Sequence, residues 1–268
     1  MKTSLKIALL VAALSAPLSA LAHKAWLQPS ATVLSSDEWI TVDAAVSNDL
    51  FHFNHVPLRA EALQITAPDG SQVAPAHVHT GKLRTVFDLQ LSQAGTWRLA
   101  AINRGLFASW EEDGQRRRWR GTPERFAAEV PAGAPGLEVV ESLGRIETYV
   151  TAGNPDTGVF ALTGKGIELQ PVTHPNDLFE GEQASFRLLL DGQPAAGLEV
   201  EVVRGATRYR NHQEEIRVST DAEGRFSVTW PVPGMYWLEA SVQDDKATVP
   251  QARNRRASYV LTVEVLPQ

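Results

Sequence analysis

Short apolar runs separated by turn residues occupy most of the chain. In the first half, β-branched and apolar residues partly alternate with polar ones. This pattern predicts strands at 39–42, 44–46, 62–67, 83–91 and 95–100. One of them ends at Pro68-Asp69-Gly70, a turn in which proline fixes φ and glycine accepts a positive φ. Short strands with turn signals about ten residues apart are typical of a β-sandwich or β-barrel.

The second half, from Gly166 onward, has the same pattern with closer spacing. Turn signals fall at Asp191-Gly192 and at 221–224. About seven strands in about 100 residues are typical of an immunoglobulin-like sandwich. These strands are predicted at 167–172, 184–190, 198–203, 216–218, 226–230, 235–242 and 259–265.

Residues 111–130 interrupt this rhythm. The segment is polar, carries an arginine run at 116–120, and includes 123–129, which could form a short helix before a loop at 131–136. The chain is therefore predicted to be all-β, with two β-sandwich domains at 23–164 and 165–268. The C-terminal domain is expected to be immunoglobulin-like, and the first to contain a short helical or irregular insertion.

The first 22 residues have the pattern of a secretory signal peptide. Lys2 and Lys6 provide a positive start, and the apolar run 7–14 is too short to span a bilayer core of roughly 30 Å. Cleavage after Ala20-Leu21-Ala22 would make His23 the first residue of a periplasmic protein, whereas a rival cut after Ala20 has the bulkier Leu18 three positions back. No later apolar stretch is long enough for a membrane helix, so no integral membrane segment is expected after cleavage.

Charge and cysteine content narrow the possible partners. The formal net charge is −6, and it becomes −8 once Lys2 and Lys6 are removed. This balance argues against a nucleic-acid partner and against an anionic membrane surface. Since the chain has no cysteine, thiolate ligands and disulfides are excluded, and any metal must be held by histidine, carboxylate, amide or amine groups. No enzyme motif is found, so the protein is not expected to be an enzyme.

Five of the seven histidines lie in the first domain: His23, His52, His55, His77 and His79. As the first residue, His23 would offer both an α-amine and an imidazole, a nitrogen pair suited to Cu(II) or Ni(II). His77 and His79 share one face if they lie on a strand. If residues 51–55 are also a strand, His55 points with Phe51 and Phe53 and is more buried than His52. All five histidines are candidate ligands for nickel, cobalt or copper.

Simpler interpretations stay open for each histidine. His77 and His79 lie between Pro75 and Gly81, so they could belong to a solvated hairpin tip, and His52 and His55 could have no metal role. His174 and His212 are expected to be structural or merely exposed. A mature start at Leu21 would place histidine third, which is itself a copper- and nickel-chelating arrangement.

Blocks along the chain resemble a periplasmic family of domains of unknown function that is labelled as nickel or cobalt uptake components. The opening residues 23–29 resemble its H-x-x-W-L-x-P start, and further similar blocks lie at 47–57, 94–98, 149–151, 167–172, 176–178, 181–182 and 191–194. The resemblance implies a non-enzymatic periplasmic protein that handles a divalent metal through His23 and, less directly, His55. It also implies a membrane transporter or an outer-membrane receptor as partner, although the chain lacks the Met-His start and membrane helices of the permease subunits that share the label.

The leading hypothesis is thus a periplasmic binding protein for Ni, Co or Cu that acts in uptake or handling of the ion. The alternative is a non-metal adhesion or scaffold module, or an accessory module of an outer-membrane receptor. A third class, a copper oxygenase with a histidine brace, would need a second histidine beside His23 and a flat substrate face.

Overall fold

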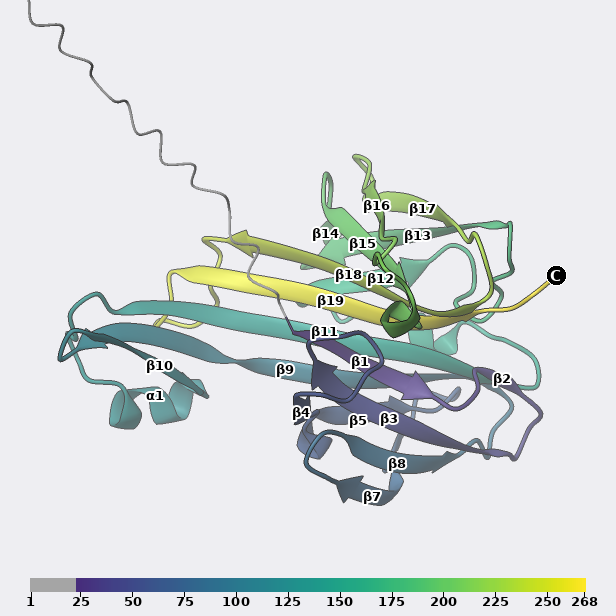
Figure 1. The fold of residues 1–268 in the computed structure, drawn as a ribbon, viewed down its shortest axis with the longest axis horizontal. Coiled ribbons are helices and arrows are strands. Elements are labelled where there is room, and N and C mark those ends of the chain that lie inside the picture. The colour runs from purple at the N-terminus through teal and green to yellow at the C-terminus, as the bar shows by residue number, and fades with distance from the viewer. Residues whose placement is uncertain (1–22) are drawn as a thin grey trace, which may run out of the picture.

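Three β-sheets stacked in layers make up the protein (Figure 1). The computed structural model describes residues 23–268, so the predicted signal peptide lies outside the described residues. One α-helix, α1 (Pro123–Glu129), occurs in the described part of the chain, beside three single 3-10 turns: η1 (Ala60–Ala62), η2 (Gly158–Phe160) and η3 (Thr207–Tyr209). The all-β prediction is confirmed, as is the short helix in the first half.

The first sheet is antiparallel and has five strands. Its order is β1 (Lys24–Pro29), β3 (Trp39–Ser47), β8 (Thr85–Gln90) and β7 (Ala76–Thr80), with β4 (Val56–Pro57) paired to β3. Strand β3 alternates Ile40, Val42 and Ala44 inward, all nearly fully buried, with exposed or half-buried Trp39, Thr41 and Asp43. Because one face packs on the core and the other meets water, period-two patterning made these strands predictable.

The central sheet has ten strands and passes through both halves of the chain. Its order is β16 (Ile216–Ser219), β15 (Glu199–Arg204), β18 (Gly234–Asp244), β19 (Asn254–Val265), β11 (Glu138–Ala152), β9 (Gly95–Glu112), β5 (Leu63–Thr66) and β6 (Gln72–Val73). Two further strands pair at its sides, β10 (Gln115–Gly121) with β9 and β2 (Val33–Leu34) with β11. The halves join at β11 and β19, which run parallel from Val140↔Asn254 to Thr148↔Thr262.

The third sheet completes the second sandwich. It contains β12 (Ile167–Pro171), β13 (Gln183–Leu190), β14 (Gln193–Pro194) and β17 (Arg225–Thr229). All seven strands predicted after Gly166 are confirmed, and the fold is two β-sandwiches of which the second is immunoglobulin-like. The predicted domain boundary falls between η2 and β12; it stays a prediction.

Each sandwich has its own hydrophobic core, and strand β11 contributes to both. Val150 packs with Trp26 and Trp97 in the first core, whereas its neighbour Tyr149 packs with Phe186 and Trp230 in the second. Successive residues of a strand point to opposite faces, so β11 is buried on both sides. The central sheet therefore serves as one layer of each sandwich.

Up to Gly121, the polar segment of the first half forms a β-hairpin and not an irregular insertion. Strand β9 continues to Glu112, far beyond the predicted end at residue 100, and pairs with β10 through Arg120↔Phe107. A small third core fills the space under α1, where Trp110 and Val130 are buried and Trp119 stacks edge-on with Phe126. The hairpin and α1 lie together at one end of the central sheet (Figure 1).

Candidate metal site at the first strand

His23 precedes β1, and the residues that follow it are firmly held. Trp26 is completely buried, with its ring 5.5 Å from that of Phe51. Trp237 donates its indole N–H to the carbonyl of Ala25 at 2.9 Å. The Lys24 ammonium lies 3.2 Å from Glu201 and 4.5 Å from the ring centre of Trp237. The start of β1 is thus fixed at a surface position, with the His23 side chain exposed.

His55 reaches the same place from the loop between β3 and β4. Its neighbour Asn54 is held by the loop, because its backbone N–H donates to Ser47 Oγ at 3.3 Å and its side-chain amide donates to Asp49 at 2.7 Å. Strand β4 then pairs with Ala45 and Val46 of β3, the same two residues that pair with β1 along the other edge of β3. As a result the imidazoles of His23 and His55 are stacked, with ring centres 4.0 Å apart and planes at 23°.

These two histidines present imidazole nitrogens, the donor type that a Cu(II) or Ni(II) ion accepts. Imidazole lone pairs lie in the ring plane, so nearly parallel rings have to rotate about their side-chain bonds before both nitrogens face one ion. The third nitrogen would be the α-amine that cleavage before His23 creates. Between residues 23 and 268 there is no cluster of three or more His, Cys, Asp or Glu side chains arranged to hold an ion. The donor chemistry fits, and a full ligand set depends on the α-amine.

His52 lies against a positive group. The guanidinium of Arg208 approaches its Nδ1 to 3.3 Å, which is unfavourable for a bound cation. The expected burial order of His52 and His55 is wrong, because His52 is half-buried and His55 is exposed. The reason is that Phe51 takes a left-handed φ of 55°, so residues 51–55 form a loop and strand alternation does not apply.

His77 and His79 lie on β7, at the edge of the first sheet. The pairing of β7 with β8 shifts register between Ala76 and His79, and His77 has a left-handed φ of 49°. The His77 ring bonds to Asp88 at 2.9 Å and stacks on the exposed Trp39 at 6.1 Å. Neither β7 histidine makes a ring contact with another of the described histidines.

His174 is structural. Its Nδ1 accepts the backbone N–H of Asn176 at 3.1 Å, so its Nε2 carries the proton and lies 3.1 Å from the carbonyl of Asp156. Burial lowers the pKa of His174 below its ordinary value. The ring therefore stabilises the junction as a neutral group and has no free nitrogen for a metal.

A buried ion network between the sandwiches was not apparent from the sequence. Arg145 lies 3.0 Å from Glu147 and 3.2 Å from Glu168, and Glu147 also accepts the hydroxyls of Tyr149 and Tyr259. These five residues are all at least nine-tenths buried. Nothing in the local pattern of charged residues distinguishes them from the solvated ones, since their burial results from the pairing of β11 with β19.

The fold and the histidine pair define a two-sandwich β-protein with a candidate metal site at its first strand. Residues 20–244 match the family described as Domain of unknown function (DUF4198), and the chain belongs to it. No curated protein matches the chain.

Solved structures with similar β-architecture have little sequence in common with this chain. The D0-D1 domain of intimin is 13% identical, with 90% of this chain and 97% of that chain covered and a TM-score of 0.23. Trypsin-activated alpha-2-macroglobulin from Escherichia coli is 12% identical, with 90% and 16% covered and a TM-score of 0.23. Fibronectin(III)-like modules of Clostridium thermocellum CbhA are 12% identical, with 89% and 94% covered and a TM-score of 0.21.

Proposed function

We propose that the mature protein is a periplasmic binding protein for a divalent transition metal, with Cu(II), Ni(II) and Co(II) as the candidate ions. The observation that carries the proposal is the stack of His23 on His55, two residues 32 positions apart that the folding of β1 onto β3 brings together. Export with cleavage before His23 would add the α-amine as a third nitrogen. The ion is cargo in this proposal, and the protein acts in its uptake or handling.

The surroundings of the pair support a binding role and not a catalytic one. His23 and His55 are exposed, and the fixed groups beside them, Lys24, Trp26 and Trp237, are engaged in packing and hydrogen bonds. No helix in the described part of the chain is long and apolar enough to cross a membrane. A transporter or an outer-membrane receptor is the proposed partner that delivers or receives the ion.

Calorimetry on protein that begins at His23 tests the proposal. Each of the three ions is titrated into metal-free protein and into the variants His23→Ala, His55→Ala and His79→Ala. Loss of an outer-shell residue around a metal typically costs about 10- to 100-fold in affinity, so loss of His23 or His55 is expected to cost at least that much. His79→Ala, an exposed histidine outside the stack, is the matched control and should bind like the parent.

A second variant isolates the α-amine. Protein with one glycine added before His23 keeps both imidazoles but moves the amine away from the imidazole of His23, and it is expected to bind Cu(II) and Ni(II) more weakly. Binding weaker than micromolar for every ion would refute the proposal. The alternative, an adhesion or scaffold module, predicts instead that the His23 variant retains full function and that a partner binds without metal.

A further inference from the structure

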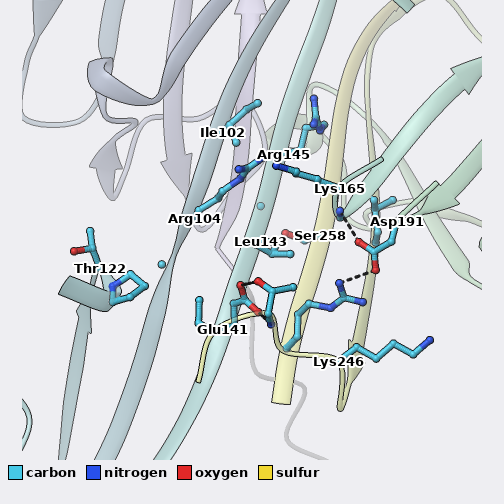
Figure 2. Close-up of a pocket in the computed structure, with 18 of the residues that line it drawn as sticks. Ile102, Arg104, Thr122, Glu141, Leu143, Arg145, Lys165, Asp191, Lys246 and Ser258 are labelled. Carbon is cyan, nitrogen blue, oxygen red and sulfur yellow. Dashed lines mark hydrogen bonds and ion pairs between the residues drawn. The ribbon is translucent and has the colours of Figure 1, made fainter. Parts of the chain in front are cut away.

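A cavity of about 710 Å³ lies where the two halves of the central sheet meet. Its floor is formed by β9, β11 and β19, and its walls by the start of α1 with Thr122 and by loops at 164–166 and 246–249 (Figure 2). Arg104 pairs with Leu143 and Ile102 with Arg145 across β9 and β11, so these side chains lie on the face of the sheet that lines the cavity. This volume is within the range of roughly 300–1,000 Å³ found for small-molecule sites.

The lining combines apolar side chains with charges that are already paired. Ile102, Leu143, Ile167 and Val249 give the cavity an apolar surface. Buried Arg255 is held by Asp191 at 2.7 Å and also by Asp244. The buried carboxylate of Glu141 accepts both the backbone N–H and the hydroxyl of Thr248, each at 2.5 Å. Because these charged groups already have partners, their side chains are held in place around the cavity.

Arg104 and Lys165, in contrast, have no carboxylate partner among residues 23–268. Figure 2 shows their side chains extending toward each other over the cavity, with Glu141 at the opposite end. Two unpaired cations facing one hollow favour an anion between them. The chain as a whole is negative, with a net charge of −6, so the unpaired positive charges of Arg104 and Lys165 reflect a local arrangement and not an overall excess of basic residues.

A second, smaller hollow of about 90 Å³ shares Arg104, Gly105 and Thr122 with the first, but its other residues from β9, Asn103 and Phe107, lie on the opposite face of the sheet. It adds Arg59 and Arg120, and neither of these forms an ion pair within the described residues. The Arg120 guanidinium lies over the ring of Phe107 at 4.8 Å. Arg120 pairs with Phe107, whereas Arg104 pairs with Leu143, so Arg120 lies on the face of the sheet away from the larger cavity. Arg125 also lines this hollow but is neutralised by Glu129 at 2.7 Å.

We propose that the larger cavity is a binding site for an amphipathic organic anion. Arg104 and Lys165 would bind its carboxylate or phosphate head group, and the apolar surface around Leu143 and Ile167 would receive its hydrocarbon part. Arginine suits this role because its planar fork of N–H donors matches both oxyanions. The site is independent of the histidine pair and uses none of its residues.

Calorimetry on the metal-free mature protein, with EDTA present and ligands below their micelle concentrations, tests this site. Dodecanoate and dodecyl phosphate are the probes, and their relative affinities distinguish a fatty-acid source from a phosphate-monoester source. Dodecanol and dodecyltrimethylammonium, which keep the chain but lack the negative charge, are the matched ligands. At least one anion is expected to bind with one-to-one stoichiometry, and the two uncharged or cationic ligands at least about tenfold more weakly.

Variants separate the head-group site from the cavity. Arg104→Gln and Lys165→Gln are each expected to lower anion affinity about tenfold, whereas Arg118→Gln, an exposed arginine that does not line the cavity, should have no effect. Leu143→Trp, which would fill the apolar part of the cavity, should remove the preference for dodecanoate over butanoate. The proposal is refuted if neither anion binds, if dodecanol binds as tightly as the anions, or if Arg118→Gln weakens binding as much as Arg104→Gln.

Discussion

Replacing Glu147 by leucine is expected to lower the free energy of unfolding by about 3–5 kcal/mol. The Glu147 side chain is only 3% exposed and accepts three donors: Arg145 at 3.0 Å, Tyr149 at 3.0 Å and Tyr259 at 2.8 Å. The substitution removes all three hydrogen bonds at once. It leaves Arg145 with Glu168 as its remaining carboxylate, at 3.2 Å.

The magnitude follows from what remains buried. Each tyrosine hydroxyl left without an acceptor costs about 1–3 kcal/mol, and the half-neutralised Arg145 adds to this cost. The leucine side chain returns about 1.5–3 kcal/mol through its own burial. Tyr149→Phe removes one donor and leaves Glu147 with two others, so it is expected to cost only about 1–2 kcal/mol.

Urea unfolding, followed by tryptophan fluorescence and far-UV circular dichroism, measures these differences. Tyr209→Phe is the control, because Tyr209 is 84% exposed and should change stability by less than about 0.5 kcal/mol. The triple variant Glu147→Leu/Tyr149→Phe/Tyr259→Phe should recover part of the loss, since it leaves no orphaned hydroxyl. A single Glu147→Leu variant within about 1 kcal/mol of the parent, or a triple variant less stable than the single one, would show that the network does not act as argued.

Three further predictions use other buried groups. Burial lowers the pKa of His174 below 6.5, so folding favours its neutral form. The resulting stability is present above pH 6.5 and is lost as the pH falls below it. His174→Gln should therefore reduce the change in urea stability between pH 7.5 and pH 5.5. Burial and Glu147 raise the pKa values of Tyr149 and Tyr259 well above 10, so in an alkaline absorbance titration two of the four tyrosines should ionise only when the protein unfolds. Gly224→Ala should lower the free energy of unfolding by about 2–5 kcal/mol, because φ is +77° and a Cβ would meet a backbone oxygen at 2.3 Å. Gly133 has a similar φ of +70° but lies in open space, so Gly133→Ala should cost only about 1–2 kcal/mol in the same urea assay.

Strands with one solvent-exposed face were predictable from the sequence, and strands buried on both faces were not. Strand β3 shows period-two burial, and all seven predicted strands of the second half are present. From Arg145 to Ala152, strand β11 is buried on both faces, so no alternation marks it. Its polar residues there, including Glu147 and Thr148, are buried by tertiary partners that lie more than 100 positions away.

The hairpin of β9 and β10 was hidden for the opposite reason. Strand β10 is polar and exposed along most of its length, so it resembles a solvated loop. Its partner is fixed by register with β9, and Trp119 alone contributes substantially to the small core beside Phe126. Cross-strand pairs of this kind depend on which strand lies opposite, which a single stretch of sequence does not specify.

For the candidate metal site too, some features were predictable from the sequence and others were not. The clustering of histidines in the first half was visible in the sequence, whereas a mature start at His23 stays a prediction, and strand periodicity gave the wrong burial for His55. The left-handed φ of Phe51 turns the chain out of strand β3 and into the loop that carries His55 over β1. A non-glycine residue in that region costs about 1–2 kcal/mol, and here the edge-on contact of Phe51 with the buried Trp26 at 5.5 Å helps to offset it. The position of the His23–His55 pair at the surface thus depends on the contact of Phe51 with Trp26 in the core beneath it. Phe51→Ala therefore tests how the pair is positioned better than a change to the exposed residues around it.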